Sequence, residues 1–231
     1  MEFTLQSISM GQLLLIDKPL KWTSFQAVNK IRWGLRTKFN IKRLKVGHAG
    51  TLDPLASGLL LICTGKMTKK INELQTLDKT YTGTITLGAT TPSFDLETPI
   101  NKKFKISHLN DKGLIAATEK FKGDIDQYPP LFSAIKKKGK RLYEYARAGN
   151  KIQIKSRKVK IHHFDFKKIE LPDLAFEVKC SKGTYIRSLA NDFGKSVDSG
   201  GYLSSLRRIE IGPYEVINAV TPQEFIEKLE L

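Results

Sequence analysis

The stretch GHAGTLDPLASG, residues 47–58, holds a single carboxylate, Asp53, directly before a proline. Pro54 disfavours the helical conformation at Asp53. Tight turns and the close approach of a ligand backbone are permitted by three glycines: Gly47, Gly50 and Gly58. A carboxylate held in this way could act as a nucleophile in covalent catalysis. The alternative is structural, because Asp-Pro more often forms an Asx turn ahead of a strand.

A second stretch with possible chemistry is KCSKGTYIRSLA, in which Tyr185 and Arg187 are two residues apart. On an extended strand end their side chains would project the same way, next to Gly183, where a ligand could come close. An arginine lowers the pKa of a lone catalytic carboxylate and orients it by paired hydrogen bonds. An arginine that contacts phosphate is an equally open alternative. Tyr81, at the start of a predicted strand, could likewise be a simple core aromatic.

Two other chemistries are excluded by missing residues. The one candidate phosphate loop has Leu60 in place of its first glycine and Met67 in place of the metal-binding hydroxyl. The His-x-Glu and Pro-Cys-x-x-Cys patterns of zinc-dependent base deaminases do not occur. The only cysteines, Cys63 and Cys180, lie in apolar segments, so we expect two buried thiols, no disulfide and no metal site.

The charge of the chain points to a polyanionic partner. Lys and Arg number 39 against 23 Asp and Glu, a formal net charge of +16. Residues 30–45 carry seven basic side chains and no acid, and residues 136–160 carry eleven against the single acid Glu144. A merely solvated face would mix both signs. Nucleic acid is favoured over a membrane surface, because the pattern predicts no strongly amphipathic basic helix with an aromatic face.

The order of predicted elements is irregular. Strands are expected over residues 11–17, 59–63, 79–87, 159–166, 174–180 and 202–211, and helices from about 23, over 67–77 and 107–121, from about 184 and from 221. The first helix is expected to place Phe25, Val28, Ile31 and Leu35 on one apolar face. Residues 124–160 are expected to form a basic loop region with a short helix. This mixture predicts an α+β protein with several antiparallel strands.

Seven motifs together resemble the TruB family of bacterial tRNA pseudouridine synthases, which act on uridine 55 in the T loop. They are DKP at 17–19, GHAGTLDPLASGLLLICTGKMTK, KTY at 79–81, PPLFSAIK, GKRLYEYAR, CSKGTYIRSLANDFG and LRR at 206–208. The resemblance runs from about residue 11 to residue 225. It implies the pseudouridine synthase fold, a mixed, mostly antiparallel sheet flanked by helices and RNA-binding loops. Its reaction detaches uracil from C1′ of the ribose, rotates it and rejoins it through C5, without cofactor or metal.

The resemblance also implies roles for individual residues. Asp53 would be the nucleophile and Arg187 its partner, while Tyr81 would stack on the flipped uracil and help the final proton transfer. Base flipping costs a few kcal/mol, and stacking on an aromatic returns roughly 1 to 3 kcal/mol. His48 would fill the gap left in the T loop by the flipped nucleotide. Tyr185 and Leu206 would form the wall of the pocket and contact the base. Asp95 would help to place the substrate.

Some positions depart from the family pattern. The chain is expected to be one catalytic domain over residues 1–231 without the C-terminal RNA-binding PUA domain of longer members, and to act as a cytoplasmic monomer. Lys21 replaces the glycine of DKPxGxTS, and Thr90 and Pro92 stand where many members carry arginine and aspartate. Two alternatives stay open: a non-catalytic RNA-binding or tRNA-folding protein, and a pseudouridine synthase that acts on another RNA stem-loop.

Overall fold

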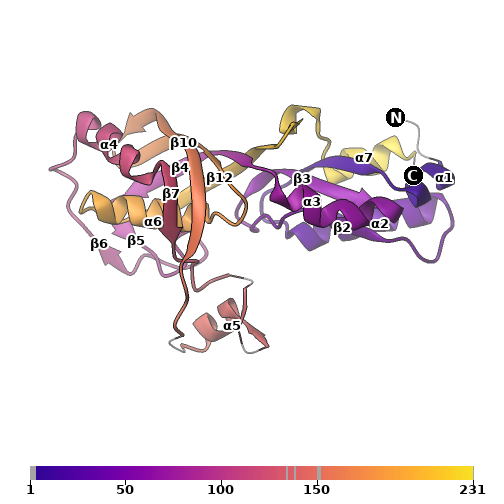
Figure 1. The fold of residues 1–231 in the computed structure, drawn as a ribbon, viewed down its shortest axis with the longest axis horizontal. Helices are drawn as coiled ribbons and strands as arrows, with labels where there is room; N and C mark the ends of the chain where they lie inside the picture. The colour runs from indigo at the N-terminus through magenta and orange to yellow at the C-terminus, as the bar shows by residue number, and fades with distance from the viewer. Residues whose placement is uncertain (1–3, 134, 138, 150–151, 231) are drawn as a thin grey trace. The chain divides into compact units, whose positions relative to one another are not determined.

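The computed structural model describes residues 4–133, 135–137, 139–149 and 152–230 (Figure 1). The chain forms two compact units, Met1–Tyr81 with Leu206–Leu231, and Thr82–Ser205. Strands β4 (Lys79–Leu87) and β12 (Gly201–Ile211) each contribute residues to both units. The expectation of one catalytic domain over residues 1–231 stays a prediction.

The first unit is built around strand β3 (Ser57–Thr64), which is buried along almost its whole length. It pairs antiparallel with β1 (Leu13–Lys18) and β2 (Val46–His48), and parallel with β12. Strand β13 (Tyr214–Glu215) extends β12. The helical elements of this unit are α1 (Leu5–Met10), α2 (Ser24–Lys38), η1 (Gly65–Lys70), α3 (Ile71–Thr76), η3 (Val216–Asn218) and α7 (Pro222–Lys228).

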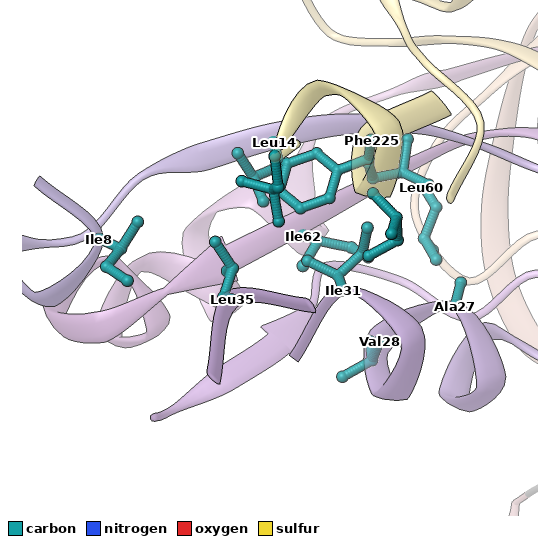
Figure 2. Packing of buried hydrophobic residues seen from close by; sticks show 12 residues of the cluster. Ile8, Leu14, Ala27, Val28, Ile31, Leu35, Leu60, Ile62 and Phe225 are labelled. Carbon is teal, nitrogen blue, oxygen red and sulfur yellow. The ribbon is translucent and has the colours of Figure 1, made fainter. Parts of the chain in front are cut away.

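Helix α2 covers one face of this sheet. Its buried side chains meet Leu14, Leu60 and Ile62 from the strands and Phe225 from α7 (Figure 2). Val28, Ile31 and Leu35 are buried as expected, but the expectation for Phe25 is wrong, because its side chain is 61% exposed. The apolar face is rotated toward two small residues, Ala27 and Gly34. At Gly34 a Cβ atom would lie only 2.2 Å from Ile226 Cδ1 of α7, so this close helix contact sets the orientation of α2.

The second unit contains the strand order β12-β4-β11-β10-β7, with β7 (Gly123–Gln127), β10 (Arg157–Glu170) and β11 (Asp173–Cys180). Helices α4 (Asp111–Thr118), η2 (Glu119–Phe121) and α6 (Ile186–Ser196) belong to it. Aromatic ring contacts, all edge-to-face except one tilted pair, join its core: Phe121, Phe164, Phe166, Phe176 and Phe193. Two short hairpins complete it, β5 (Ala89–Thr90) with β6 (Lys102–Lys103), and β8 (Lys136–Lys137) with β9 (Lys140–Arg141).

The basic region predicted over residues 124–160 begins in β7 and ends in β10. Between them lie the β8–β9 hairpin, whose turn contains Gly139 at φ 83°, and the predicted short helix, α5 (Leu142–Arg147). In Figure 1 this segment stands away from the sheet of its unit. Residues 134, 138, 150 and 151 of the predicted region lie outside the described residues.

The predicted α+β class and its mostly antiparallel sheet are confirmed. The capping box at the last helix is also confirmed, with Thr221 accepting from the N–H of Glu224 at 3.2 Å and Pro222 at the first helical position. The helix predicted over residues 107–121 is shorter, because Asn110 caps its start and its last turn is a 3₁₀ helix. Helix α1 and strand β7 were not predicted, since both are short and each has at most three apolar residues.

Candidate active site

Asp53 lies in a backbone turn between β2 and β3. The N–H of Ala56 donates to the Asp53 carbonyl oxygen at 3.1 Å, which closes a turn with Pro54 at its second position, where proline is favoured. The Pro54 carbonyl oxygen accepts from the N–H of Lys21 at 2.7 Å. Lys21 has φ 67°, a conformation that glycine adopts without steric cost. This explains why the related motif carries glycine there.

The start of α2 is fastened to the residue directly before Asp53. The Ser24 hydroxyl donates to the Leu52 carbonyl oxygen at 3.0 Å and accepts from the Leu52 N–H at 2.8 Å. Ser24 is 3% exposed, so neither hydrogen bond competes with solvent. The capping box of Thr23 and Gln26 fixes the same helical turn. The position of the Asp53 backbone is therefore coupled to a helix that is packed in the core.

Arg208 holds the same loop from the other side. Its guanidinium is 1% exposed and donates to three backbone carbonyl oxygens, two of them in the loop. The distances are 2.7 Å from Nε to Leu59, 3.2 Å from Nη2 to Gly50 and 3.5 Å from Nη1 to Thr51. A buried arginine with its fork directed at carbonyl oxygens fixes backbone geometry in more than one direction. Arg208 thus defines the path of the chain into and out of the Asp53 turn.

The glycines of the loop have different roles. Gly50 has φ 99°, a conformation that glycine adopts without steric cost, in the bend that follows β2. Gly58 lies opposite Arg208 in the parallel pairing of β3 and β12, and a Cβ atom on it would come within 2.2 Å of the Arg208 carbonyl oxygen. The expectation that a ligand backbone uses the space at Gly58 is therefore wrong, because the neighbouring strand of the same protein fills it.

Lys18 places a buried positive charge near Asp53. Its side chain has no solvent exposure, and Nζ donates to the carbonyl oxygens of Pro19 at 2.8 Å and Trp22 at 2.6 Å. Burial lowers the pKa of Lys18 from 10.5 to about 8; the negative charge of Asp53 opposes this change, and the positive charge of Arg208 adds to it. Lys18 is therefore mostly protonated at neutral pH, but it loses its proton at a pH well below that at which an exposed lysine titrates.

This pKa predicts a rise in stability with pH. The unfolded chain keeps the Lys18 proton up to about pH 10.5, whereas the folded chain releases it near pH 8, so unfolding is disfavoured as the pH rises through this window. From pH 7.5 to 9 the wild type should gain about 1 kcal/mol of unfolding free energy relative to a Lys18→Met variant. Urea unfolding of both proteins at the two pH values measures the difference. Above pH 9 the Cys63 thiol, whose pKa burial raises to about 11, lowers the stability of both proteins alike, so its contribution cancels in the difference. Parallel pH dependences of the two proteins would contradict the prediction.

The other candidate residues of the first unit lie on three strands, β2, β4 and β12. His48 ends β2, and its pKa is lowered by burial and by the positive charge of Arg208, so the ring is neutral at neutral pH. Its Nδ1 is buried and has no hydrogen-bond partner among the described residues. Tyr81 is 8% exposed in β4. Leu206 is half-buried in β12, two residues before Arg208.

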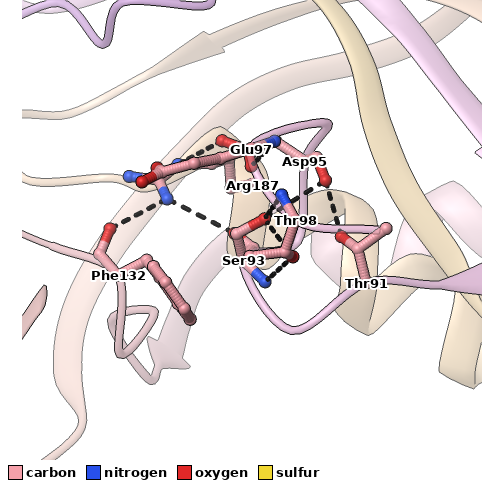
Figure 3. A network of polar contacts seen from close by, with 7 residues as sticks. All are labelled: Thr91, Ser93, Asp95, Glu97, Thr98, Phe132 and Arg187. Atoms are coloured by element: carbon pink, nitrogen blue, oxygen red, sulfur yellow. Dashed lines mark hydrogen bonds and ion pairs between the residues drawn. The ribbon is translucent and has the colours of Figure 1, made fainter. Parts of the chain in front are cut away.

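In the second unit, Arg187 and Asp95 form a buried pair. Arg187 Nε lies 3.5 Å from Asp95 Oδ2, with the two side chains 5% and 7% exposed. Arg187 Nη1 also donates to the carbonyl oxygens of Phe132 at 2.9 Å and Ser93 at 3.3 Å. Asp95 Oδ1 accepts from the N–H of Glu97 at 2.9 Å. Figure 3 shows these contacts converging on the Arg187 guanidinium, which is held in one orientation.

The loop that carries Asp95 is braced by hydroxyl groups. Thr91 Oγ1 donates to the Asp95 carbonyl oxygen at 2.7 Å, and Ser93 Oγ does so at 3.2 Å. The Ser93 and Thr98 hydroxyl groups lie 2.8 Å apart (Figure 3). The resemblance implies that Asp95 places the substrate, but it does not imply the pair of Asp95 with Arg187. The predicted pairing of Arg187 with Asp53 stays a prediction, because the two residues belong to different units.

Tyr185 immediately precedes α6. Its backbone exchanges two hydrogen bonds with the Gln127 side chain, at 2.8 and 3.1 Å, and its ring lies 5.5 Å from the Arg157 guanidinium carbon. The expectation that Tyr185 and Arg187 share an extended strand end is wrong, because α6 begins at Ile186 and Arg187 is in its first turn. The helix predicted from about residue 184 is confirmed.

Three further residues contribute to this site without a catalytic or binding role predicted from the sequence. Lys18 and Ser24 fall in the segment DKPLKWTS, and Arg208 falls in the LRR motif, which marked them only by resemblance. Among the described residues, no three His, Cys, Asp or Glu side chains gather as a metal site requires. Within the same part of the chain, no helix combines the length and apolar character needed to cross a membrane.

Comparison with known proteins agrees with the family that the seven sequence motifs resemble. The sequence model described as "TruB family pseudouridylate synthase (N terminal domain)" matches residues 36–186. A "tRNA pseudouridine synthase B" of Flavobacterium johnsoniae is 60% identical over 221 residues, which cover 95% of this chain and 96% of the relative. A protein of the same name from Phocaeicola vulgatus is 46% identical, with coverages of 95% and 94%.

A solved structure also shares the fold. The chain superposes on one in the "Crystal Structure of a Cbf5-Nop10-Gar1 Complex" with a TM-score of 0.71 and 27% identity. The match covers 95% of this chain but only 54% of the other, so this chain spans about half the length of that neighbour.

Proposed function

Because the chain belongs to the TruB family of pseudouridylate synthases, we propose that it isomerises uridine to pseudouridine in tRNA, at position 55 of the T loop. The observation that carries the proposal is the 60% identity to a tRNA pseudouridine synthase B over almost the whole of both chains. The reaction rearranges the atoms of one nucleotide, so it consumes no oxidant, reductant or group donor. The strongly basic composition suits a tRNA substrate.

Asp53 is the proposed nucleophile. Its carboxylate supplies electrons to an electron-poor carbon of the sugar or the base and later departs, which divides a difficult step into two easier ones. Support comes from the rigid backbone around it, because Ser24 and Arg208 hold the residues before and after the turn. A nucleophile fixed in this way loses little entropy when the substrate reaches it. Arg187 is proposed to orient the carboxylate.

The remaining residues are proposed to hold the flipped nucleotide. Tyr81 stacks on the uracil and helps the last proton transfer, and Tyr185 and Leu206 form the wall of the pocket. His48 fills the gap left in the T loop, a role that suits an imidazole whose pKa is lowered and which is therefore uncharged against the bases. Asp95 contributes to substrate placement through Arg187, whose guanidinium it contacts. The protein is proposed to act in the cytoplasm as a monomeric single-domain enzyme, without a metal ion.

The test is release of tritium from a T stem-loop RNA that carries uridine labelled at C5. Forming the new bond at C5 displaces the label, so the wild type should release up to one tritium per RNA. An RNA with labelled uridines elsewhere but cytidine at the target position is the matched control and should release none. A protein that remodels tRNA without releasing label would instead be a non-catalytic RNA-binding protein. Release from the control RNA would contradict the assignment to position 55.

A further inference from the structure

The outer face of α2 carries an aromatic and basic stripe that the proposed reaction does not use. We define the α2 stripe as the residues opposite the buried face of this helix and spaced three or four apart: Phe25, Asn29, Arg32, Trp33 and Arg36. Phe25 is 61% exposed and Trp33 is 53% exposed. Single exposed apolar residues need no explanation, but two large rings about two helical turns apart on one stripe, with cations beside them, form a surface.

Both rings of the α2 stripe are accompanied by cations. Lys30 Nζ lies 5.1 Å from the centroid of the Trp33 ring, and the Arg32 guanidinium carbon lies 5.9 Å from that of Phe25. Arg32 Nε is buried and has no hydrogen-bond partner among the described residues. None of the seven basic side chains of residues 30–45 forms an ion pair within the described parts of the chain. This surface therefore has positive charge without a counter-charge.

The α2 stripe begins beside the proposed nucleophile. Ser24, the first residue of α2, is hydrogen-bonded to Leu52, the residue before Asp53, and Phe25 follows directly. A helix of 15 residues extends about 22 Å from that junction. An RNA whose target uridine lies at Asp53 can therefore reach the stripe with nucleotides near the target in space, whether or not they are near in sequence.

We propose that the α2 stripe binds unpaired nucleotides of the tRNA outside the T stem-loop. Their bases stack on Phe25 and Trp33, and their phosphates meet Arg32 and Arg36. Only unpaired bases expose the faces that stack on aromatic side chains, and such stacking is worth about 1 to 3 kcal/mol per base. The inference rests on the proposed function in taking tRNA as the RNA and Asp53 as the place of its target uridine.

An anionic membrane is the main rival partner, because the structure reveals the aromatic and basic helix face that the sequence pattern did not predict. The α2 stripe does not suit it well. Helices that lie in a membrane interface insert a continuous apolar face. In α2 the continuous apolar face is packed in the core, and the two exposed rings alternate with Asn29 and the two arginines. Interleaved rings and cations are typical of single-stranded nucleic-acid surfaces.

The experiment compares affinities of the full chain for an unmodified full-length tRNA transcript and for its isolated T stem-loop. Phe25→Ala/Trp33→Ala should weaken binding of the full-length tRNA by about 10- to 100-fold, and that of the T stem-loop by less than about twofold. Arg32→Gln/Arg36→Gln should lower the dependence of log affinity on log salt by about two for full-length tRNA. Met10→Ala/Ile217→Ala, which removes exposed apolar side chains elsewhere in the same unit, should change neither.

Binding of the same variants to vesicles of phosphatidylserine and phosphatidylcholine is measured as well. Three outcomes would overturn the inference. The aromatic variant could keep its affinity for full-length tRNA, it could lose affinity equally for both RNAs, or it could lose affinity for the vesicles alone. Thermal unfolding of each variant checks that the fold is intact, as expected for exposed side chains. Tritium release from the T stem-loop by the wild type tests the proposed function separately. If the wild type turns over the T stem-loop and every variant binds each RNA as tightly as the wild type does, only the inference is refuted, and the proposed function stands.

Discussion

Replacing Asp53 with asparagine is expected to reduce pseudouridine formation by on the order of 10⁴-fold or more, as removal of a nucleophile does in other enzymes. The amide has nearly the same shape as the carboxylate but lacks its negative charge and cannot form the covalent intermediate. RNA affinity should stay within a few fold, because the Asp53 backbone and the surrounding basic residues are unchanged. Single-turnover tritium release and equilibrium binding on T stem-loop RNA measure the two effects.

Asp111→Asn is a matched control for this change. Asp111 is an exposed aspartate in the first turn of α4, where the loss of one charge should leave turnover unaltered. A large loss in both variants would point to a general effect of charge. Undiminished turnover in the Asp53 variant would refute the assignment of the nucleophile.

Replacing Arg208 with methionine is expected to have the largest effect on stability. The change removes the donors to the buried carbonyl oxygen of Leu59 and to the partly buried carbonyl oxygens of Gly50 and Thr51, and a buried acceptor left unsatisfied costs about 1 to 3 kcal/mol. The free energy of unfolding should fall by about 3 to 5 kcal/mol in urea titrations. Where the variant remains folded, kcat should fall about 100-fold with a smaller change in KM, because a displaced nucleophile affects the chemical step.

Arg207→Met is the control, since it removes the neighbouring arginine of the same strand. Arg207 is 40% exposed and forms a two-pronged ion pair with Asp17, so its loss should cost only about 1 kcal/mol. Arg208→Lys keeps the charge but offers a single donor group, and should fall between wild type and the methionine variant. Equal stability of the Arg207 and Arg208 methionine variants would contradict the role of Arg208 in holding the loop.

Features that depend on nearby residues could be predicted from the sequence. The alternation from residue 79 to 87, the Thr221 capping box and the turn at Pro54 all appear in the structure. The prediction that Phe25 lies on the buried face of α2 is wrong, because a search for periodic apolar residues gives weight to large side chains and little to small ones. The packed side instead uses Ala27 and Gly34, whose small size lets α7 come close.

Features that depend on distant residues could not be predicted. The role of Arg208 requires the parallel pairing of β12 with β3, which joins residues 150 apart in the chain. The contact of Arg187 with Asp95 likewise depends on a loop about 90 residues earlier in the chain. In both cases a motif marked the arginine, but only the fold reveals which backbone or carboxylate it contacts.

The close approach of β12 to Gly58 also bears on synthesis of the protein. A ribosome makes the Asp53 loop about 150 residues before the strand that fixes it. Until that strand is made, the carbonyl oxygens of Gly50 and Thr51 cannot accept hydrogen bonds from Arg208. The nascent chain therefore carries its proposed nucleophile through the synthesis of about 150 further residues without the arginine that shapes the loop around it. The loop can take its final geometry only once β12 has been made and pairs with β3.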